Sequence, residues 1–461
     1  MNNLDISNLL KPFLENEIIS LESTIIDATT NLQSASDDSI CFYHIGDTSD
    51  AKTLFLERLK KTKCRNLILS KNIEVEDANI WVIGHENFLS AQEEIANHLF
   101  PNENKIKIAG ITGTNGKTTV SFLAMQMSSL LGSPAISIGT IGIRSLEKTL
   151  EEDILSTTPS YLELRKIIHK YQDTYKYIFM EVSSHALAQK RLSSIELEFS
   201  AWTSFSQDHL DYHKNYQDYF NAKLKILDST KNKEITIPST EVDLREKLAD
   251  AGVVVDLVSP LFDESIDIGF RASYNQANLA VAKRLVERIT NKKVSENILR
   301  KLTLPAGRFE SISYGDHIII IDYAHTPDAL DNICSTIKTD FSDFNLRVVF
   351  GCGGDRDRLK RPLMGQAVSK YADSIIVTSD NPRSEVPSEI IDNIVPGISV
   401  EFKREDDRRK AIGLSLSDLA SKTVVLIAGK GHEEYQDVKG EKHHFSDREE
   451  VLKFISEREN V

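Results

Sequence analysis

A glycine-rich segment that ends in lysine and threonine is the clearest candidate for chemistry in this sequence. It reads TGTNGKTT, and it lies between a short apolar run and a helix-compatible run from Val120 to Leu131. Glycines let backbone N–H groups approach phosphate oxygens, lysine neutralises phosphate charge and a threonine hydroxyl can bind Mg²⁺. Five residues, not four, separate Gly110 from Gly116, so the general spacing is not met literally and a glycine-rich turn stays the alternative. The segment predicts an ATP-binding loop of Gly113, Thr114, Asn115, Gly116, Lys117, Thr118 and Thr119.

Acidic and histidine residues follow two further strand-like runs. Glu181 comes directly after Tyr177–Met180, and the sequence DHLDYH (208–213) follows Phe199–Thr203. The carboxyl ends of parallel strands meet at one sheet edge, so both segments are expected beside the phosphate loop. A carboxylate and a histidine there could hold Mg²⁺ and order a triphosphate. Each of them alone would more often be a capping or hydrogen-bonded residue, but together with the phosphate loop they favour a metal site.

A third candidate is the tetrapeptide Asp380-Asn381-Pro382-Arg383, which follows the apolar run Ser374–Val377. An arginine can bind a carboxylate through two parallel charge-assisted hydrogen bonds. Asn-Pro after a strand is also typical of a turn. Whether this tetrapeptide binds a ligand carboxylate or only forms a turn therefore has to be decided from the other motifs of the chain.

The elements that must position these residues alternate between short β-rich runs and helical patterns, which predicts an α/β fold with parallel sheets. Turn-rich segments near residues 104 and 310 divide the chain into predicted domains of residues 1–104, 105–310 and 311–461. The predicted strands not yet named are Ile106–Ala109, Ile318–Ile321, Leu346–Phe350 and Val424–Ile427. Polar residues or glycine follow each strand, where ligands bind in open α/β sheets.

Composition narrows the possible partners and compartment. The chain has 461 residues, 40% of them apolar, which is more than one core usually holds. Its formal net charge of -14 argues against nucleic acid or an anionic membrane as a general partner. The four cysteines lack paired metal spacing, the N-terminus lacks the pattern of a signal peptide, and no apolar run is long enough for a membrane span. A cytoplasmic location is expected.

Six motifs in order give the chain a resemblance to the Mur ligases, and more narrowly to those of the MurE type. They are GTNGKT, EVSSHAL, DHLDYH, DYAHTPD (322–328), GCGGDR (351–356) and GKGHE (429–433). The resemblance implies an N-terminal domain for a uridine nucleotide, a central P-loop ATPase domain and a C-terminal Rossmann-like domain for the incoming amino acid. The N-terminal domain departs from the family pattern, because Asp27–Thr30 and Cys41–Gly46 stand where Asp-Ser-Arg and a Phe-Val-Ala strand are usual.

The resemblance also implies a reaction. ATP phosphorylates the D-glutamyl carboxylate of UDP-N-acetylmuramoyl-L-alanyl-D-glutamate, and an amino acid then attacks the acyl phosphate, which adds the third residue of the peptidoglycan stem peptide. Lys117 and a metal set are the implied catalytic groups, with Mg²⁺ held by Thr118, Glu181, His209 and Lys223. Lys223 would be carbamylated, which turns a cation into a carboxylate suited to Mg²⁺; an unmodified surface-helix lysine is the alternative, and Lys225 is a less well matched candidate.

The remaining contacts are assigned by resemblance alone. Further ATP contacts are Asn278, Arg308 and Asp322. The muramoyl-dipeptide contacts are Thr157, Thr158, Ser183, Gln189 and Arg191. The amino-acid contacts are Arg356, Asp380, Asn381, Pro382, Arg383, Gly429 and Glu433.

Arg383 decides the expected amino acid. It can bind the distal carboxylate of meso-diaminopimelate, whereas it would repel the bare ammonium of L-lysine. L-Lysine stays the alternative within the same reaction. Two further hypotheses are less well supported by the motifs. One is another ligase of this fold, such as the tripeptide-to-pentapeptide ligase or folylpolyglutamate synthase, and the other is a non-catalytic scaffold. A monomer is expected.

Overall fold

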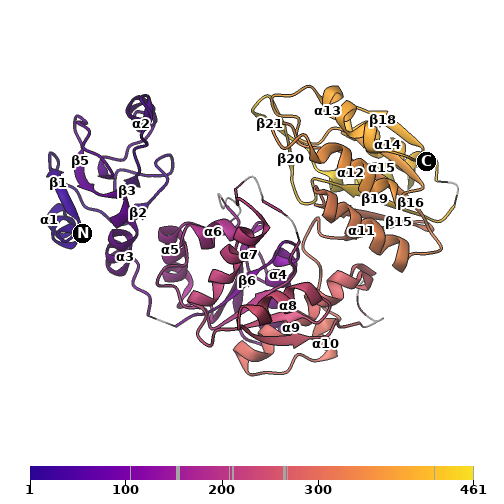
Figure 1. Ribbon diagram of the computed structural model, residues 1–461, viewed down its shortest axis with the longest axis horizontal. Coiled ribbons are helices and arrows are strands. Elements are labelled where there is room, and N and C mark those ends of the chain that lie inside the picture. Colours follow the sequence, from indigo (N-terminus) through magenta and orange to yellow (C-terminus); the bar gives the residue numbers. More distant parts are fainter. Residues whose placement is uncertain are drawn as a thin grey trace. The chain divides into compact units, whose positions relative to one another are not determined.

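The computed structural model describes residues 1–103, 105–151, 156–206, 208–209, 212–262, 266, 268–419 and 421–459 (Figure 1). The chain forms two compact units, one of residues 1–110, 133–199 and 220–233, and one of residues 111–132, 200–219 and 234–461. The predicted boundary residue Asn104 and the motif residues Leu210 and Asp211 lie outside the described residues. The other predicted boundary falls at the start of strand β14 (Glu310–Tyr314).

The first unit begins with a sheet of five strands in the order β1-β5-β4-β3-β2. Its strands are β1 (Leu14–Ile18), β2 (Asp27–Thr29), β3 (Ser39–Tyr43), β4 (Asn66–Leu69) and β5 (Asn79–Ile83), and its helices are α1 (Asn3–Leu10), α2 (Ala51–Leu59) and α3 (Phe88–Leu99). Strands β2 to β5 run parallel and β1 is antiparallel to β5. All residues of β4 and β5 are buried, which explains why both are continuous apolar runs apart from one asparagine each.

The rest of the first unit contains the strands that end at the predicted substrate residues. β10 (Tyr177–Glu181) pairs in parallel with β7 (Ala135–Gly139), and β8 (Gly142–Arg144) and β9 (Thr149–Glu151) continue the sheet antiparallel. Helix α5 (Tyr161–Tyr171) begins with a capping box between Ser160 and Glu163. The short helix α6 (Ser184–Ala188) follows β10 directly.

The second unit carries the phosphate loop. Strand β6 (Lys107–Thr112) ends in this unit, and helix α4 (Lys117–Leu130) follows the loop. β11 (Phe199–Trp202), β12 (Glu234–Pro238) and β13 (Val254–Val258) run parallel, and α4 packs on α9 (Ser273–Thr290). The remaining helices here are α8 (Val242–Asp250) and α10 (Glu296–Leu299), while α7 (Tyr216–Leu224) has residues in both units.

Residues 310–459 form a six-stranded sheet in the order β14-β15-β19-β16-β17-β18. All pairs are parallel except β14 with β15. The further strands are β15 (His317–Asp322), β16 (Asn345–Phe350), β17 (Ser374–Thr378), β18 (Phe402–Glu405) and β19 (Thr423–Ala428). A separate hairpin pairs β20 (Tyr435–Val438) with β21 (Glu441–His444).

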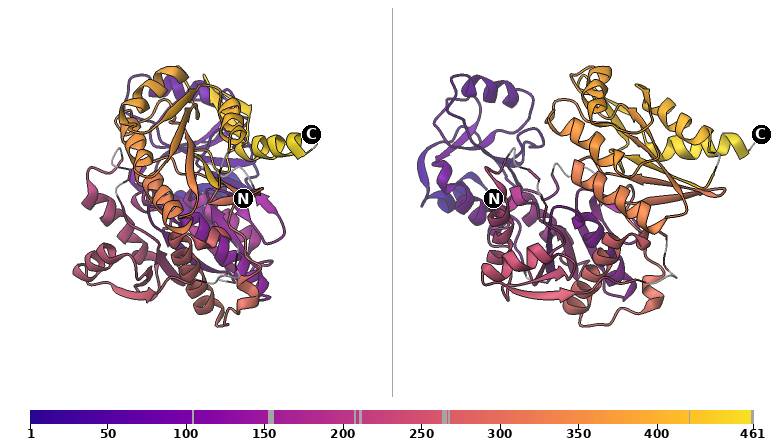
Figure 2. Two further views of the ribbon diagram at one scale, coloured as in Figure 1. Left: turned by 90° about the vertical axis from the view of Figure 1, so that its right-hand side faces the viewer. Right: turned by 45° about the vertical axis from the view of Figure 1, so that its right-hand side comes forward.

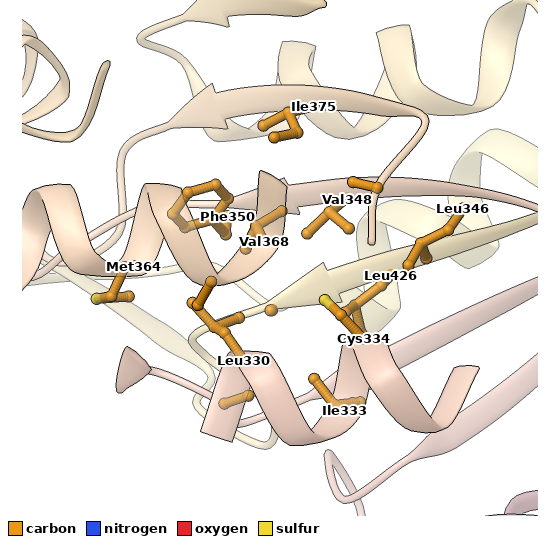
Figure 3. Close-up of a cluster of buried hydrophobic side chains, with 14 of the residues drawn as sticks. Leu330, Ile333, Cys334, Leu346, Val348, Phe350, Met364, Val368, Ile375 and Leu426 are labelled. Atoms are coloured by element: carbon orange, nitrogen blue, oxygen red, sulfur yellow. The ribbon is translucent and has the colours of Figure 1, made fainter. Parts of the chain in front are cut away.

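Helices cover both faces of this sheet (Figure 2, orange and yellow). They are α11 (Pro327–Asp340), α12 (Lys360–Ser369), α13 (Pro387–Ile394), α14 (Arg408–Ser417) and α15 (Asp447–Glu459). Alternate strand residues join two buried clusters: Val348 packs with Leu330 and Met364 (Figure 3), and Val349 packs with residues of α14 and α15. Burial on both faces explains why β15, β16, β17 and β19 each contain a run of consecutive apolar residues.

The predicted strands and the helix after the phosphate loop are therefore confirmed, and the α/β class with them. Among the residues that the structure describes, no helix is both long and apolar enough to cross a membrane.

Candidate active site

The phosphate loop has the backbone that its sequence predicts. Gly113 and Gly116 have φ values of 150° and 84°, which L side chains rarely adopt. Helix α4 begins at Lys117, so its first N–H groups face the loop. The Lys117 ammonium donates to the carbonyl oxygens of Gly113 at 2.8 Å and Thr114 at 2.9 Å, and it is thus folded over the place a phosphate would take.

Residues after β11 hold this loop, and sequence reasoning missed them. The Thr203 hydroxyl donates to the carbonyls of Thr112, at 3.2 Å, and of Asn115. The Asn115 N–H donates to the Ser204 hydroxyl at 2.9 Å, and the Thr114 N–H donates to the Ser204 carbonyl at 2.9 Å. The only signal in the sequence is a run of hydroxyl residues after a strand, which is too common to identify them.

Two other predicted ATP residues, Asn278 and Asp322, have specific neighbours in the same unit. A Cβ atom at Gly116 would clash with the Asn278 side chain, so that amide lies directly against the loop. The Asp322 carboxylate accepts from the N–H groups of Phe309 at 2.7 Å and Ala324 at 2.8 Å. Burial raises the pKa of Asp322, while Arg308 and these two N–H groups lower it.

Arg308 stacks over the Tyr323 ring, with its guanidinium carbon 4.6 Å from the ring centroid. Asp322 binds the backbone just beyond Arg308, so it fixes the chain segment that carries this cation.

His209 is the predicted metal residue of the DHLDYH segment. Its φ of 53° places it in the left-handed region, and its N–H donates to the Asp208 carboxylate at 2.8 Å. Its side chain is 47% exposed and its Nε2 lies 3.4 Å from the other Asp208 oxygen. A ring with this exposure is accessible to a ligand.

In the first unit, Glu181 is buried at the end of β10. Its Oε1 accepts from the Thr140 N–H at 2.9 Å and its Oε2 accepts from the Thr140 hydroxyl at 3.2 Å. The Thr140 hydroxyl also lies 3.2 Å from that of Thr157. Gly139 has no room for a side chain because a Cβ atom would clash with the Glu181 carboxylate.

The structure brings the predicted muramoyl-dipeptide residues together in this unit. The Thr158 hydroxyl donates to the Glu181 carbonyl at 2.9 Å and accepts from the Ser183 N–H at 3.0 Å. The Arg191 guanidinium donates to the Thr158 carbonyl at 2.5 Å and to the Gln189 side chain at 2.8 Å. These residues form one hydrogen-bonded chain of hydroxyl, amide and guanidinium groups.

Lys223 lies on α7, and its side chain is 1% exposed. The alternative of a surface lysine is therefore wrong, while Lys225 is exposed. A buried ammonium needs compensation or modification, because an isolated charge is costly in an apolar interior. Burial thus favours Lys223 over Lys225 as the functional lysine.

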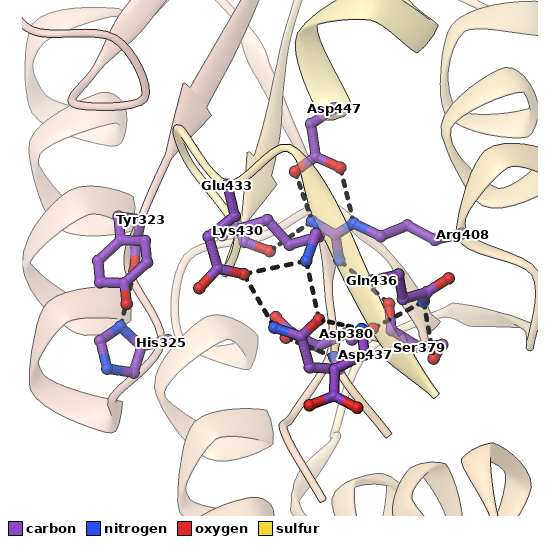
Figure 4. A network of polar contacts seen from close by, with 12 residues as sticks. Tyr323, His325, Ser379, Asp380, Arg408, Lys430, Glu433, Gln436, Asp437 and Asp447 are labelled. Atoms are coloured by element: carbon purple, nitrogen blue, oxygen red, sulfur yellow. Dashed lines mark hydrogen bonds and ion pairs between the residues drawn. The ribbon is translucent and has the colours of Figure 1, made fainter. Parts of the chain in front are cut away.

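The segment 380–383 is not a simple surface turn, since Asp380, Asn381 and Pro382 are buried. The Asn381 amide donates to Glu433 Oε2 at 2.8 Å, and its oxygen accepts from the Lys430 ammonium at 3.1 Å. This network joins the loop after β17 to the loop after β19 (Figure 4). A Cβ atom at Gly429 would lie 2.6 Å from the Asp380 carboxylate, which explains the glycine there.

The β20–β21 hairpin is bonded to the same segment. Arg383, with a φ of 51°, donates its N–H to the Asp437 carbonyl at 3.0 Å and accepts from the Lys439 N–H at 2.7 Å. The Gln436 amide donates to the Asp380 carbonyl at 2.7 Å. A non-glycine residue in the left-handed backbone conformation is strained, and such residues cluster at functional sites.

A cavity of about 450 Å³ lies beside Arg383. Its lining also includes Asp355, Asp437 and Lys439. The Arg383 guanidinium donates to the Gly354 carbonyl at 2.6 Å, so the predicted cation lies at the GCGGDR loop, which carries Arg356. Arg356 itself is exposed.

Two ion pairs hold the loops that carry these residues. Arg361 is 1% exposed and donates to both oxygens of Glu385, and this bonding lowers the pKa of Glu385 to about 2. Arg408 and Asp447 are fully buried and bonded through two contacts of 2.7 Å. Sequence reasoning missed both pairs, since nothing local relates their members.

Arg408 also bonds the backbone at the ends of two strands (Figure 4). It donates to the carbonyls of Ser379 at 3.3 Å and Ala428 at 3.0 Å, which immediately precede Asp380 and Gly429. The two predicted amino-acid loops are therefore tied to one buried guanidinium.

The chain is similar in sequence to known proteins along most of its length. Residues 111–282 match the Mur ligase middle domain and residues 307–431 match the Mur ligase glutamate ligase domain. The chain is 34% identical over 443 residues to UDP-N-acetylmuramoyl-L-alanyl-D-glutamate–2,6-diaminopimelate ligase 1 of Clostridium acetobutylicum, covering 89% of this chain and 91% of the relative. It is 33% identical to the ligase of that name from Phocaeicola vulgatus, with 98% and 94% covered.

Solved structures agree on the fold. A structure of a UDP-N-acetylmuramoyl-L-alanyl-D-glutamate–2,6-diaminopimelate ligase matches with a TM-score of 0.59 at 26% identity, covering 96% of this chain and 98% of that one. MurF ligase from Thermotoga maritima in complex with ADP matches with a TM-score of 0.62 at 14% identity, covering 94% and 98%, which shows the fold alone. With its phosphate loop, its domain matches and relatives of this identity along most of its length, the chain belongs to the Mur ligase family.

Proposed function

We propose that this Mur ligase uses ATP to join meso-diaminopimelate to the D-glutamyl carboxylate of UDP-N-acetylmuramoyl-L-alanyl-D-glutamate. The observation that carries the proposal is the similarity to relatives named for this reaction along 89% and 98% of the chain. The position of Arg383, at a cavity that also contains Asp355 and Asp437, supports the choice of amino acid. The distal carboxylate and ammonium of diaminopimelate together match a cavity lining that has both positively and negatively charged side chains. We place the reaction in the cytoplasm, where four buried thiols remain reduced.

The chemistry requires activation because a carboxylate is a poor electrophile. A D-glutamyl carboxylate oxygen attacks the γ-phosphorus of ATP, the bond to ADP breaks, and an acyl phosphate forms. The neutral amino group then attacks the acyl carbon, inorganic phosphate leaves with the C–O bond electrons, and the nitrogen loses one proton to water or to the departing phosphate. Both steps concentrate negative charge, which the loop N–H groups and Lys117 are placed to offset.

We assign Glu181 and Lys223 as magnesium ligands within the first unit, and Thr118 and His209 separately as magnesium ligands within the second. Glu181 offers two oxygens, and the buried Lys223 supplies further oxygen ligands once carbamylated. Mg²⁺ bound there would offset charge on the transferring phosphoryl group.

We assign the muramoyl-dipeptide to the hydrogen-bonded residues Thr158, Ser183, Gln189 and Arg191 and to Thr157, whose hydroxyl lies 3.2 Å from that of Thr140. Their hydroxyl, amide and guanidinium groups suit a ligand of carboxylates, amides and phosphates. The incoming amino acid is assigned to Arg356, Asp380–Arg383, Gly429 and Glu433. Both assignments rest on connected groups within one unit each.

Turnover with the two candidate amino acids tests the proposed function. ADP release should require the muramoyl-dipeptide and meso-diaminopimelate together, and L-lysine should support it far less. Arg383→Ala should raise the KM for diaminopimelate about tenfold or more while leaving that for ATP nearly unchanged, because a charge-assisted bond is lost on one substrate only. Equal turnover of the wild-type enzyme with lysine would contradict the substrate assignment.

A Lys223→Ala enzyme should lose activity and recover part of it when a short-chain carboxylate such as acetate or propionate is added. The added anion would replace the carbamate oxygens in the space that the shorter side chain leaves. The matched control is Lys225→Ala, which removes an exposed lysine from the adjoining turn and should leave the rate unchanged. Failure of every carboxylate to restore Lys223→Ala would count against carbamylation.

A further inference from the structure

Lys430 is a fully buried lysine that bonds two of the residues assigned to the amino acid, and no step above uses it. It follows Gly429 at the end of β19, and its ammonium lies between two of the assigned contact residues. It donates to Asn381 Oδ1 at 3.1 Å and to Glu433 Oε2 at 3.0 Å (Figure 4). A buried ammonium is tolerated only when its charge and hydrogen bonds are matched, and these two acceptors provide that match.

The first consequence concerns the Asn381 amide. Its oxygen accepts from both Lys430 and the Asp437 N–H, the latter at 2.9 Å, so the oxygen must point inward. The amide nitrogen then points to Glu433 at 2.8 Å and has a second hydrogen to donate. Lys430 and the Asp437 N–H together orient the Asn381 amide, and its nitrogen side is a donor suited to a carboxylate.

The second consequence concerns the charge of Glu433. Among the described residues, the side-chain hydrogen bonds that this carboxylate accepts from Lys430 and Asn381 both use Oε2, and the side chain is 17% exposed. Lys430 therefore offsets the negative charge that would attract a bare ammonium. Arg383 adds a further positive charge on the same tetrapeptide as Asn381.

We propose that Lys430 is a positioning residue that makes this site select an amino acid whose distal end carries both a carboxylate and an ammonium, and disfavours one with an ammonium alone. It acts through Asn381, whose donor it presents, and through Glu433, whose charge it offsets. The inference rests on the proposed function and deepens it. Arg383 would bind the distal carboxylate. Lys430 would keep the Glu433 carboxylate from stabilising the ammonium of bound lysine.

The test is the ratio of kcat/KM for meso-diaminopimelate to that for L-lysine in the full-length enzyme. Lys430→Met removes the charge and the hydrogen bonds, and Lys430→Gln removes the charge but keeps an amide donor. In both variants the ratio should fall about tenfold or more, through a higher KM for diaminopimelate and a lower one for lysine. The KM values for ATP and the muramoyl-dipeptide should change less than about twofold. A general structural defect would change these KM values as well.

Lys422→Met is the matched control, because it makes the same change at an exposed position just before β19. A double-mutant cycle with Glu433→Gln should show that the gain in lysine use requires the Glu433 charge. If the wild-type enzyme uses both amino acids equally, the proposed function and this inference both fail. If the wild-type enzyme is selective and either folded Lys430 variant keeps its ratio, the inference alone is overturned.

Discussion

Replacing Lys117 with alanine should lower kcat for ligation about 10³-fold or more. The ammonium is folded over the carbonyls of Gly113 and Thr114, so on binding ATP it has only to turn from these oxygens to the phosphates. It would then stabilise charge that develops on the transferring phosphoryl group, and alanine leaves this charge without its cation. Steady-state ADP release with saturating substrates measures the effect.

Lys107→Ala is the control for Lys117, because it removes an exposed lysine from the first residue of β6. Lys107 pairs with Glu198 at 3.5 Å, which is a surface contact of small energetic value. It should leave kcat within about twofold. A Lys117→Ala enzyme with the wild-type rate would remove the phosphate loop from the mechanism.

Asp447→Asn should destabilise the protein by about 3 to 5 kcal/mol, the effect expected when one partner of a buried ion pair is removed. Arg408 would keep its charge in a site with no exposure and would lose its anionic partner. The carbonyls of Ser379 and Ala428 would remain as its neutral acceptors. Thermal unfolding should show a lowered midpoint, and the KM for diaminopimelate should rise because both amino-acid loops start at these carbonyls.

The neighbouring pair of Arg409 and Glu450 gives a matched comparison. It joins the same two helices at 2.9 Å, but Arg409 is 53% exposed. Glu450→Gln should therefore cost less than about 1 kcal/mol. Equal destabilisation by Asp447→Asn and Glu450→Gln would show that burial does not make the Arg408–Asp447 pair more stabilising than the exposed pair.

Seven strands could be predicted, β6, β10, β11, β15, β16, β17 and β19, because each is a short, largely apolar run that is followed by glycine or polar residues. The phosphate loop could also be predicted, since its function depends on glycines, a lysine and a threonine that are adjacent in the chain. The burial of Lys223 could not be predicted from the sequence. Helix α7 has only a weakly amphipathic sequence, and the residues that surround the lysine come from other segments.

The sequence by itself determined the fold class, the nucleotide loop and the family, because each depends on residues that are close in the chain or on motifs in a fixed order. Tertiary structure alone decided how the amino-acid site is held together. Lys430 meets Asn381 only because the strand order puts the ends of β17 and β19 near each other with a single strand between them, and Arg408 meets Asp447 only because α14 packs on α15. Local patterns carry no information about such pairs, since their energy arises only when distant segments exclude water together.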